Sequence, residues 1–268
     1  MSTAGEVPSS PRRILGREED IARLSDLLDQ DAIRLVTLTG PGGVGKTRLA
    51  LEVARTVHGR RSRVAFVDLT PLASADLVLP TIAAALDVTP GIDQPLQQRV
   101  AQRLATEPML LVLDNFEHVL PAASDVAELL AACPQLRVMV TSREPLHLSW
   151  EQEYPVAPLT VPDLEANQSM EELAANPAVA LFVARARATD PAFALHEESA
   201  ASVAAICVRL DGLPLALELA AARARALPAR AMLDRLDHVL DVVGEGPRDA
   251  PARHRTLRAA IGWSYDLL

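Results

Sequence analysis

The stretch that decides the fold runs from Arg34 to Thr47 and reads RLVTLTGPGGVGKT. Its second half matches the pattern G-x-x-x-x-G-K-[ST], the P-loop, in which successive backbone N–H groups form a concave nest for phosphate oxygens. Lys46 is the only lysine in the chain, and all the other residues among the 26 Lys and Arg are arginine. A compact ammonium kept at this one position is typical of a contact to β- and γ-phosphates, where the planar arginine fork fits poorly.

The plain alternative is a glycine-rich turn, and the flanking segments argue against it. Residues 34–39 are short, apolar and β-branched, which predicts a buried strand. Apolar residues then recur at helical spacing over 46–58, so a helix N-terminus would point at the phosphates. The residues expected to bind nucleotide here are Gly40, Gly42, Gly43, Val44, Gly45, Lys46, Thr47 and Arg48, with the Thr47 hydroxyl as a ligand of Mg²⁺.

Bulk composition narrows the class of protein. The chain has 268 residues, with 49% hydrophobic but only 3% aromatic residues, which favours helices and a parallel sheet over a β-sandwich. A net charge of −9 argues against nucleic-acid binding by this segment. Cys133 and Cys207 are expected to be reduced core residues. With no apolar signal segment and no run of membrane-spanning length, we expect a cytoplasmic protein without a membrane partner.

Strands and helices alternate through the first half of the chain. Beyond the P-loop unit, strands are expected at 64–69, 109–113 and 136–141, and helices at 18–28, 76–86, 94–106 and 122–131. This alternation predicts a three-layer α/β domain over residues 13–155, a parallel sheet with helices on both faces. A ligand then belongs at the carboxyl ends of the strands, where the P-loop lies.

After Tyr154 the pattern becomes purely helical. Residues 156–162 are punctuated by proline and predict a domain boundary. Helices at 178–189, 198–210, 214–227 and 229–236 predict a small all-α domain over 156–245. Residues 1–12 are expected to be a disordered tail, and 246–268 a linker followed by one more amphipathic helix.

Two acidic residues follow the third predicted strand. Met109–Asp114 is apolar and ends in Asp114, which at the carboxyl edge beside the P-loop would hold Mg²⁺ directly or through water. Glu117 is the next carboxylate, either a residue that orients or deprotonates the attacking water or an exposed residue at a helix start. The residues leave both interpretations open, because Asn115 occupies the position where many hydrolytic relatives carry an acid.

An arginine follows the fourth predicted strand. Arg143 at this edge could reach a γ-phosphate and act as its sensor, the alternative being a solvated loop residue. Leu15-Gly16-Arg17 permits a tight turn against a base or ribose, and Pro214 opens a helix, but each is also an ordinary start signal.

The motifs LGRE (15–18), GPGGVGKT, LLVLDNFEHV, TSRE and GLPLA together resemble the STAND class of signal-transduction ATPases. More narrowly, they are similar to the NB-ARC/AP-ATPase modules of bacterial LuxR-type and antibiotic-regulatory (SARP-like) transcription regulators. The resemblance implies an adenine site built from Leu15, Gly16, Arg17 and Pro214. It also implies a switch that is closed with ADP and able to self-associate with ATP. Residues 255–268 resemble the start of that family's winged-helix domain, so we expect a fragment or a truncated regulator.

Two functions compete at this stage. The favoured one is a regulatory ATP/ADP switch with slow hydrolysis, carried by Lys46, Asp114, Glu117 and Arg143, with Mg²⁺ as cofactor and other regulator domains as partners. The alternative is a turnover enzyme, either a P-loop phosphotransferase or an AAA-like ATPase. A phosphotransferase would need an acceptor pocket with its own base and an arginine-rich lid, and the helical segment offers neither.

Overall fold

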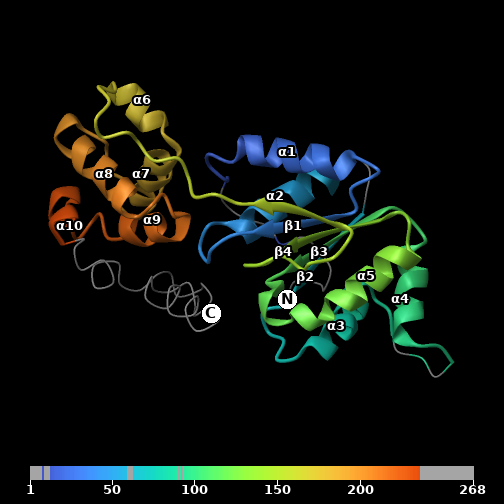
Figure 1. Ribbon diagram of the computed structural model, residues 1–268. Coiled ribbons are helices and arrows are strands. Elements are labelled where there is room, and N and C mark those ends of the chain that lie inside the picture. Colours follow the sequence, from blue (N-terminus) through green and yellow to red (C-terminus); the bar gives the residue numbers. More distant parts are fainter. Residues whose placement is uncertain (1–7, 9–12, 59–62, 90, 92, 236–268) are drawn as a thin grey trace. The chain divides into compact units, whose positions relative to one another are not determined.

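A computed structural model describes residues 8, 13–58, 63–89, 91 and 93–235 (Figure 1). The expected terminal helix within 246–268, and the expected tail except Pro8, lie outside these residues. The chain divides into two compact units. The first comprises 1–40 and 46–156, and the second comprises 41–45 and 157–268. Each unit is described by itself.

The first unit is built on a parallel sheet of five strands in the order β2-β3-β4-β1-β5. The strands are β1 (Leu35–Thr39), β2 (Arg63–Asp68), β3 (Met109–Asp114), β4 (Leu136–Thr141) and β5 (Glu151–Pro155). Because the strands are parallel, their carboxyl ends share one edge of the sheet. The chain that leaves β1 enters the P-loop there, next to the exits of β4 and β5.

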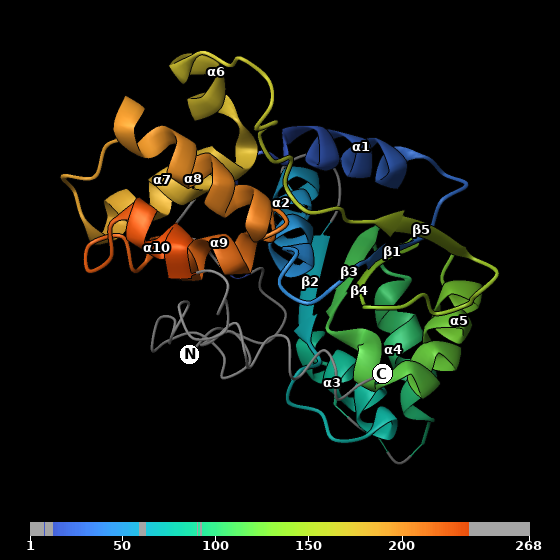
Figure 2. The ribbon, with the colours of Figure 1, turned by 60° about the vertical axis from the view of Figure 1, so that its left-hand side comes forward.

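Helices cover both faces of this sheet, as Figures 1 and 2 show. The helices of the first unit are α1 (Glu18–Asp29), α2 (Lys46–His58), α3 (Val78–Ala85), α4 (Leu96–Leu104) and α5 (Ala123–Ala132), with short 3-10 turns η1 (Ala75–Leu77), η2 (Phe116–His118) and η3 (Leu120–Ala122). α1 and α2 lie on one face, and α3, α4 and α5 lie on the other. The three layers expected from the alternating pattern are confirmed.

Side-chain alternation along the strands divides the core between the two faces. In β3, Leu111 and Leu113 belong to the apolar cluster that α3, α4 and α5 complete, whereas Leu110 and Val112 are buried outside that cluster. Every residue of β3 is buried, which is why this segment reads as a continuous apolar run rather than an alternating one. The central strands are thereby fixed firmly enough to aim the side chains at their ends.

The second unit holds α6 (Met170–Ala175), α7 (Pro177–Thr189), α8 (Glu197–Arg209), α9 (Pro214–Ala221) and α10 (Ala229–Arg235). Their apolar faces bury residues such as Phe182, Ile206 and Leu217 completely. α7 and α9 are also joined by an ion pair between Arg185 and Glu218, 2.8 Å apart. Within this unit the loop residues 41–45 lie against the start of α9, where the Leu215 N–H donates to the Gly43 carbonyl at 3.2 Å.

The structure differs from the sequence-based expectation at four elements. β5 and α6 were not expected, and α9 ends at Ala221 rather than at 227 because residues 222–226 form turns. The helix expected over 76–86 begins as the 3-10 turn η1 before it becomes α3. The other strands and helices of the described residues lie within two residues of their expected bounds.

Candidate functional site

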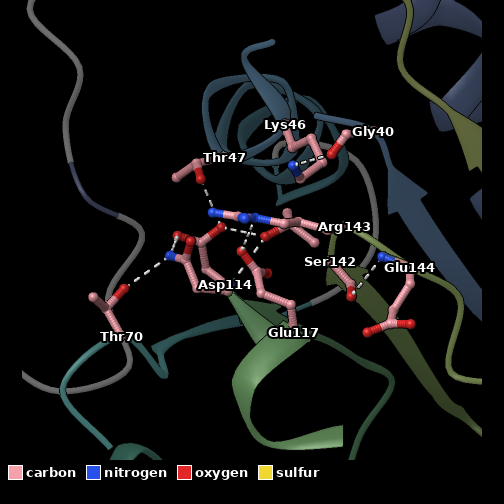
Figure 3. A network of polar contacts seen from close by, with 11 residues as sticks. Gly40, Lys46, Thr47, Thr70, Asp114, Glu117, Ser142, Arg143 and Glu144 are labelled. Atoms are coloured by element: carbon pink, nitrogen blue, oxygen red, sulfur yellow. Dashed lines mark hydrogen bonds and ion pairs between the residues drawn. The ribbon is translucent and has the colours of Figure 1, made fainter. Parts of the chain in front are cut away.

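The predicted catalytic side chains come from three neighbouring chain exits at the carboxyl edge of the sheet (Figure 3). Lys46 and Thr47 begin α2, directly after the P-loop. Asp114 ends β3, and Glu117 lies in η2 just beyond it. Arg143 follows β4 by two residues. The first unit therefore brings all five of these residues together.

Lys46 is nearly buried, with 9% of the residue exposed. Its Nζ donates to the Gly40 carbonyl at 2.6 Å, so the ammonium folds back over the start of its own loop. Burial lowers the pKa of Lys46 to about 8; Glu117 and Asp114 oppose this shift, and Arg143 adds to it. An ammonium that has lost much of its hydration gains more than a solvated one when an anion arrives. The loop glycines next to it take positive φ, +81° at Gly43 and +100° at Gly45.

The Asp114 carboxylate accepts three side-chain hydrogen bonds. Its Oδ1 accepts the Thr47 hydroxyl at 2.8 Å and the Thr141 hydroxyl at 2.6 Å, and its Oδ2 accepts from Asn115 Nδ2 at 2.8 Å. Only 3% of the residue is exposed, and burial raises the pKa of Asp114 to about 6 in spite of the two threonine hydrogen bonds, with Asp68 and Glu117 raising it further. Asp68 ends β2 directly opposite Asp114 in the strand register.

Glu117 and Arg143 form a buried ion pair. Arg143 Nε lies 3.3 Å from Glu117 Oε1, and only 15% and 5% of the two side chains are exposed. The other carboxylate oxygen, Oε2, is buried and has no hydrogen-bond partner among the described residues. Both alternatives that treated these residues as exposed are therefore wrong. A buried, half-satisfied carboxylate beside a phosphate nest has room in its bonding for one more donor, such as a water.

Asn115 takes the left-handed conformation, with φ +63°. Its side-chain amide donates to Asp114 Oδ2 and to Thr70 Oγ1, each at 2.8 Å, and its backbone N–H donates to Thr141 Oγ1 at 3.0 Å. Asn115, which occupies the position of a second acid, is thus hydrogen-bonded to Asp114. The next carboxylate along the chain is that of Glu117, which forms an ion pair with Arg143.

The residues predicted to bind adenine are divided between the two units. Gly16 has φ +65°, as a tight turn before α1 requires. Arg17 is buried, but its guanidinium pairs with Asp20 at 3.0 Å, and Tyr154 donates to the same carboxylate at 2.5 Å. Leu15, Gly16 and Arg17 belong to the first unit and Pro214 to the second, so a joint adenine site stays a prediction.

The donor set fits a magnesium nucleotide. Hard oxygen ligands, a hydroxyl and a carboxylate, are provided by Thr47 and Asp114, which already touch each other. The phosphate charge would meet the buried Lys46 ammonium and the N-terminus of α2. Within the described residues there is no cluster of three or more His, Cys, Asp or Glu side chains that could hold another metal ion.

Sequence reasoning missed two members of this network, Thr141 and the structural role of Asn115. Thr141 is part of the TSRE motif, but its partner follows only from the strand register. Leu113 pairs with Val140, which places Asp114 across from Thr141 on the neighbouring strand. The pattern of an apolar strand ending in a hydroxyl residue, next to one ending in an acid, is the signal that could have found it.

Comparison with known proteins agrees with this geometry. Residues 30–149 match the family described as "AAA domain". The matched segment starts before β1 and ends after the exit of β4, so it contains Lys46, Asp114, Glu117 and Arg143. Together with the sheet order and the P-loop, this match over less than half of the chain agrees with a P-loop nucleotide-binding fold for the first unit.

Two relatives come from Mycobacterium tuberculosis strain H37Rv. One, named "Putative HTH-type transcriptional regulator Rv0890c", is 40% identical over 236 residues, which are 88% of this chain and 25% of that protein. The other, "Uncharacterized protein Rv0894", is 36% identical and covers 98% of this chain and 64% of its own length. The chain thus spans about a quarter of the length of the regulator.

Solved structures share the fold at low sequence identity. The Aeropyrum pernix ORC1 protein, in a structure with DNA, has a TM-score of 0.54 and 19% identity over 88% of this chain and 66% of its own. Cdc6p from Pyrobaculum aerophilum has a TM-score of 0.53 and 15% identity over 82% of this chain and 65% of its own. The P-loop fold class is thereby confirmed. None of the helices in the described ranges is both long and apolar enough to cross a membrane.

Proposed function

We propose that this chain is the nucleotide switch of a bacterial transcriptional regulator, a module that binds ATP and ADP and hydrolyses ATP slowly. The match to the AAA domain supports a nucleotide as the ligand, and the relative named as a transcriptional regulator supports the regulatory setting. Lys46 contacts the β- and γ-phosphates. Thr47 and Asp114 hold Mg²⁺, which when bound would offset phosphate charge and fix the phosphate geometry.

The observation that carries the proposal is the buried ion pair between Glu117 and Arg143, 3.3 Å apart. A γ-phosphate is an oxyanion that competes with the Glu117 carboxylate for the same guanidinium, whereas ADP brings no such competitor. With ADP, Arg143 therefore stays on Glu117. With ATP, the γ-phosphate competes for Arg143, so Arg143 leaves Glu117 in part of the population. One side chain with two alternative partners is a two-state element that nucleotide can bias.

The same arrangement accounts for slow hydrolysis. Glu117 can orient or deprotonate the attacking water only while Arg143 is elsewhere, because a paired carboxylate is a weaker base. Asn115 offers no substitute, since its amide is neutral and donates to Asp114 and Thr70. Turnover is thus limited by how often Glu117 is free in the ATP state.

The finer assignment, to the STAND class and its NB-ARC modules, is part of this proposal. It adds adenine binding by Leu15, Gly16, Arg17 and Pro214, self-association in the ATP state, and further domains in a longer parent regulator. It also keeps the expectation that this segment itself does not bind nucleic acid. The ORC1 structure with DNA shares only the fold at 19% identity, so the charge of −9 remains the argument for that expectation.

The test compares nucleotide affinities of arginine variants in a Glu117→Gln background, which avoids leaving an unpaired buried carboxylate. Arg143→Ala should weaken binding of a non-hydrolysable ATP analogue by about 10- to 100-fold, the value of a hydrogen bond to a charged group. Its affinity for ADP should stay within about threefold. Arg63→Ala is the matched control, because Arg63 pairs with Glu107 at 3.0 Å on the exposed surface. Equal losses for both nucleotides would refute the sensor role of Arg143.

The alternative function is a turnover enzyme. It predicts a kcat within the range of about 1–100 s⁻¹ that is typical of kinases, whereas a switch should turn over far more slowly. A measurement of steady-state phosphate release from the wild-type chain separates the two.

A further inference from the structure

The hydroxyl of Thr141 has two hydrogen-bond partners, and they are consecutive residues of the neighbouring strand end. It donates to Asp114 Oδ1 at 2.6 Å and accepts the backbone N–H of Asn115 at 3.0 Å. Thr141 is 1% exposed, so water cannot replace either bond. We propose that Thr141 is the positioning residue of this site: its one hydroxyl holds both the metal-binding carboxylate and the turn that carries Glu117.

The first half of this role concerns the direction of the Asp114 carboxylate. Oδ1 is held by two hydroxyls, from Thr47 on α2 and from Thr141 on β4, and Oδ2 is held by the Asn115 amide. Thr47 and Asn115 also take part in other interactions. Thr47 is expected to ligate Mg²⁺, and the Asn115 amide also donates to Thr70. Thr141 is the donor that comes from a buried central strand, and it therefore fixes the carboxylate relative to the sheet.

The second half concerns the turn after Asp114. Asn115 has φ +63°, a conformation that a non-glycine residue holds only when its surroundings stabilise it. The hydrogen bond from its N–H to Thr141 is such a support, and it satisfies a backbone donor that would otherwise be unpaired. Asn115 directly precedes η2, so this hydrogen bond also fixes the start of the turn that carries Glu117.

Thr141 thereby joins the two chain segments that the switch uses. Thr141 ends β4, two residues before Arg143. Its hydroxyl donates to Asp114, in the segment that also carries Glu117. This inference rests on the proposed nucleotide function and adds the residue that keeps the sensor segment and the metal segment in register. Valine has nearly the same shape as threonine but lacks the hydroxyl, and serine keeps the hydroxyl.

The experiment measures the dissociation constant of a non-hydrolysable ATP analogue, with Mg²⁺ in excess and with EDTA, for the full chain and three variants. The readout is the ratio of the two constants, which isolates the contribution of the metal. Loss of a residue that orients a metal ligand typically weakens metal affinity 10- to 100-fold, so Thr141→Val should lower the ratio by about that factor. The EDTA value should stay within about threefold, because the P-loop and Lys46 are unchanged.

Two further variants serve as controls. Thr141→Ser should keep the wild-type ratio. Thr37→Val is matched in chemistry and burial, because Thr37 lies in β1 with 0% exposure and its hydroxyl has no hydrogen-bond partner among the described residues. It should also keep the wild-type ratio.

The outcomes separate the two levels of the proposal. A wild-type ratio in Thr141→Val, while the chain still binds Mg²⁺ and nucleotide, overturns the role of Thr141 and leaves the nucleotide function standing. A similar loss with and without Mg²⁺, or one that Thr141→Ser shares, also overturns it, because general damage to the sheet would then explain the result. If the wild-type chain binds no nucleotide under either condition, both the inference and the proposed function are refuted.

Discussion

Replacing Asp114 by asparagine should stabilise the nucleotide-free protein while it destroys the metal site. Burial raises the pKa of Asp114 from 3.8 to about 6, so the folded state disfavours the ionised form. At about 1.36 kcal/mol per pKa unit, the ionised carboxylate costs the fold about 3 kcal/mol at pH 8. Asparagine keeps an oxygen for the hydroxyls of Thr47 and Thr141. Its amide group requires Asn115 to turn its own oxygen toward it, so we expect a net gain of about 2 kcal/mol.

The pH dependence provides the sign of the effect. Because the folded pKa lies above the unfolded one, the folded state binds the extra proton between about pH 6 and pH 4, and the cost disappears as pH falls through that window. The advantage of Asp114→Asn should therefore be full at pH 8 and should vanish near pH 4. Lys46 is little affected, since Asp114 is the smallest of the influences on its pKa.

The assay is urea unfolding at pH 8, 6 and 4 with EDTA present, followed by the fluorescence of Trp150 in a Trp263→Phe background. Trp150 belongs to the first unit and stacks against the Arg34 guanidinium at 4.4 Å. Asp68→Asn is the control, because Asp68 stands opposite Asp114 at the same edge but is exposed, and it should change stability by less than about 0.5 kcal/mol. An Asp114→Asn variant that gains nothing at pH 8, or gains the same amount at pH 4, would show that the buried charge is not the cost we assign to it.

The remaining predictions concern nucleotide binding and turnover. Lys46→Ala should abolish ADP binding by calorimetry and leave the circular dichroism spectrum unchanged, because its Nζ donates to a carbonyl of the loop itself, that of Gly40. Unchanged ADP affinity would refute the assignment of the P-loop. Glu117→Gln should lower the rate of phosphate release about 100-fold or more without weakening ATP binding, because the carboxylate acts on the water and its loss leaves Arg143 to the γ-phosphate. Wild-type turnover in that variant would make Glu117 a structural partner of Arg143 and nothing more.

The central part of the fold could be predicted from sequence because its elements carry strong signals. β1, β3 and β4 are buried runs of apolar residues, and α2 has a clear helical period that starts at Lys46. β5 was missed because an edge strand pairs on one side only, and its sequence EQEYP is half exposed and polar. α6 is short, yet the capping box of Ser169 and Glu172 is a local sequence signal for its N-terminus.

The site divides in the same way. Lys46, Thr47 and Asp114 follow from motifs because phosphate and Mg²⁺ require those residue types at those chain exits. The partner of Glu117 did not follow, since its ion pair with Arg143 joins segments 26 residues apart and depends on where η2 turns. Side-chain pairs of this kind are set by register and turn geometry, which residue types alone do not encode.

The strand order has a mechanical consequence. β4, β1 and β5 are adjacent, so the exit that carries Arg143, the exit that forms the phosphate loop and the exit that leads to residues 156–162 lie side by side. Neighbouring strands are separated by about 4.8 Å, so the exits of β4 and β5 are about 10 Å apart. The path between them crosses two backbone ladders, and the last rung is the hydrogen bond from the Val156 N–H to the Thr39 carbonyl at 2.8 Å. If Arg143 moves with the bound nucleotide, as proposed, its movement has only this short distance to cover to reach the chain that leaves the sheet after β5.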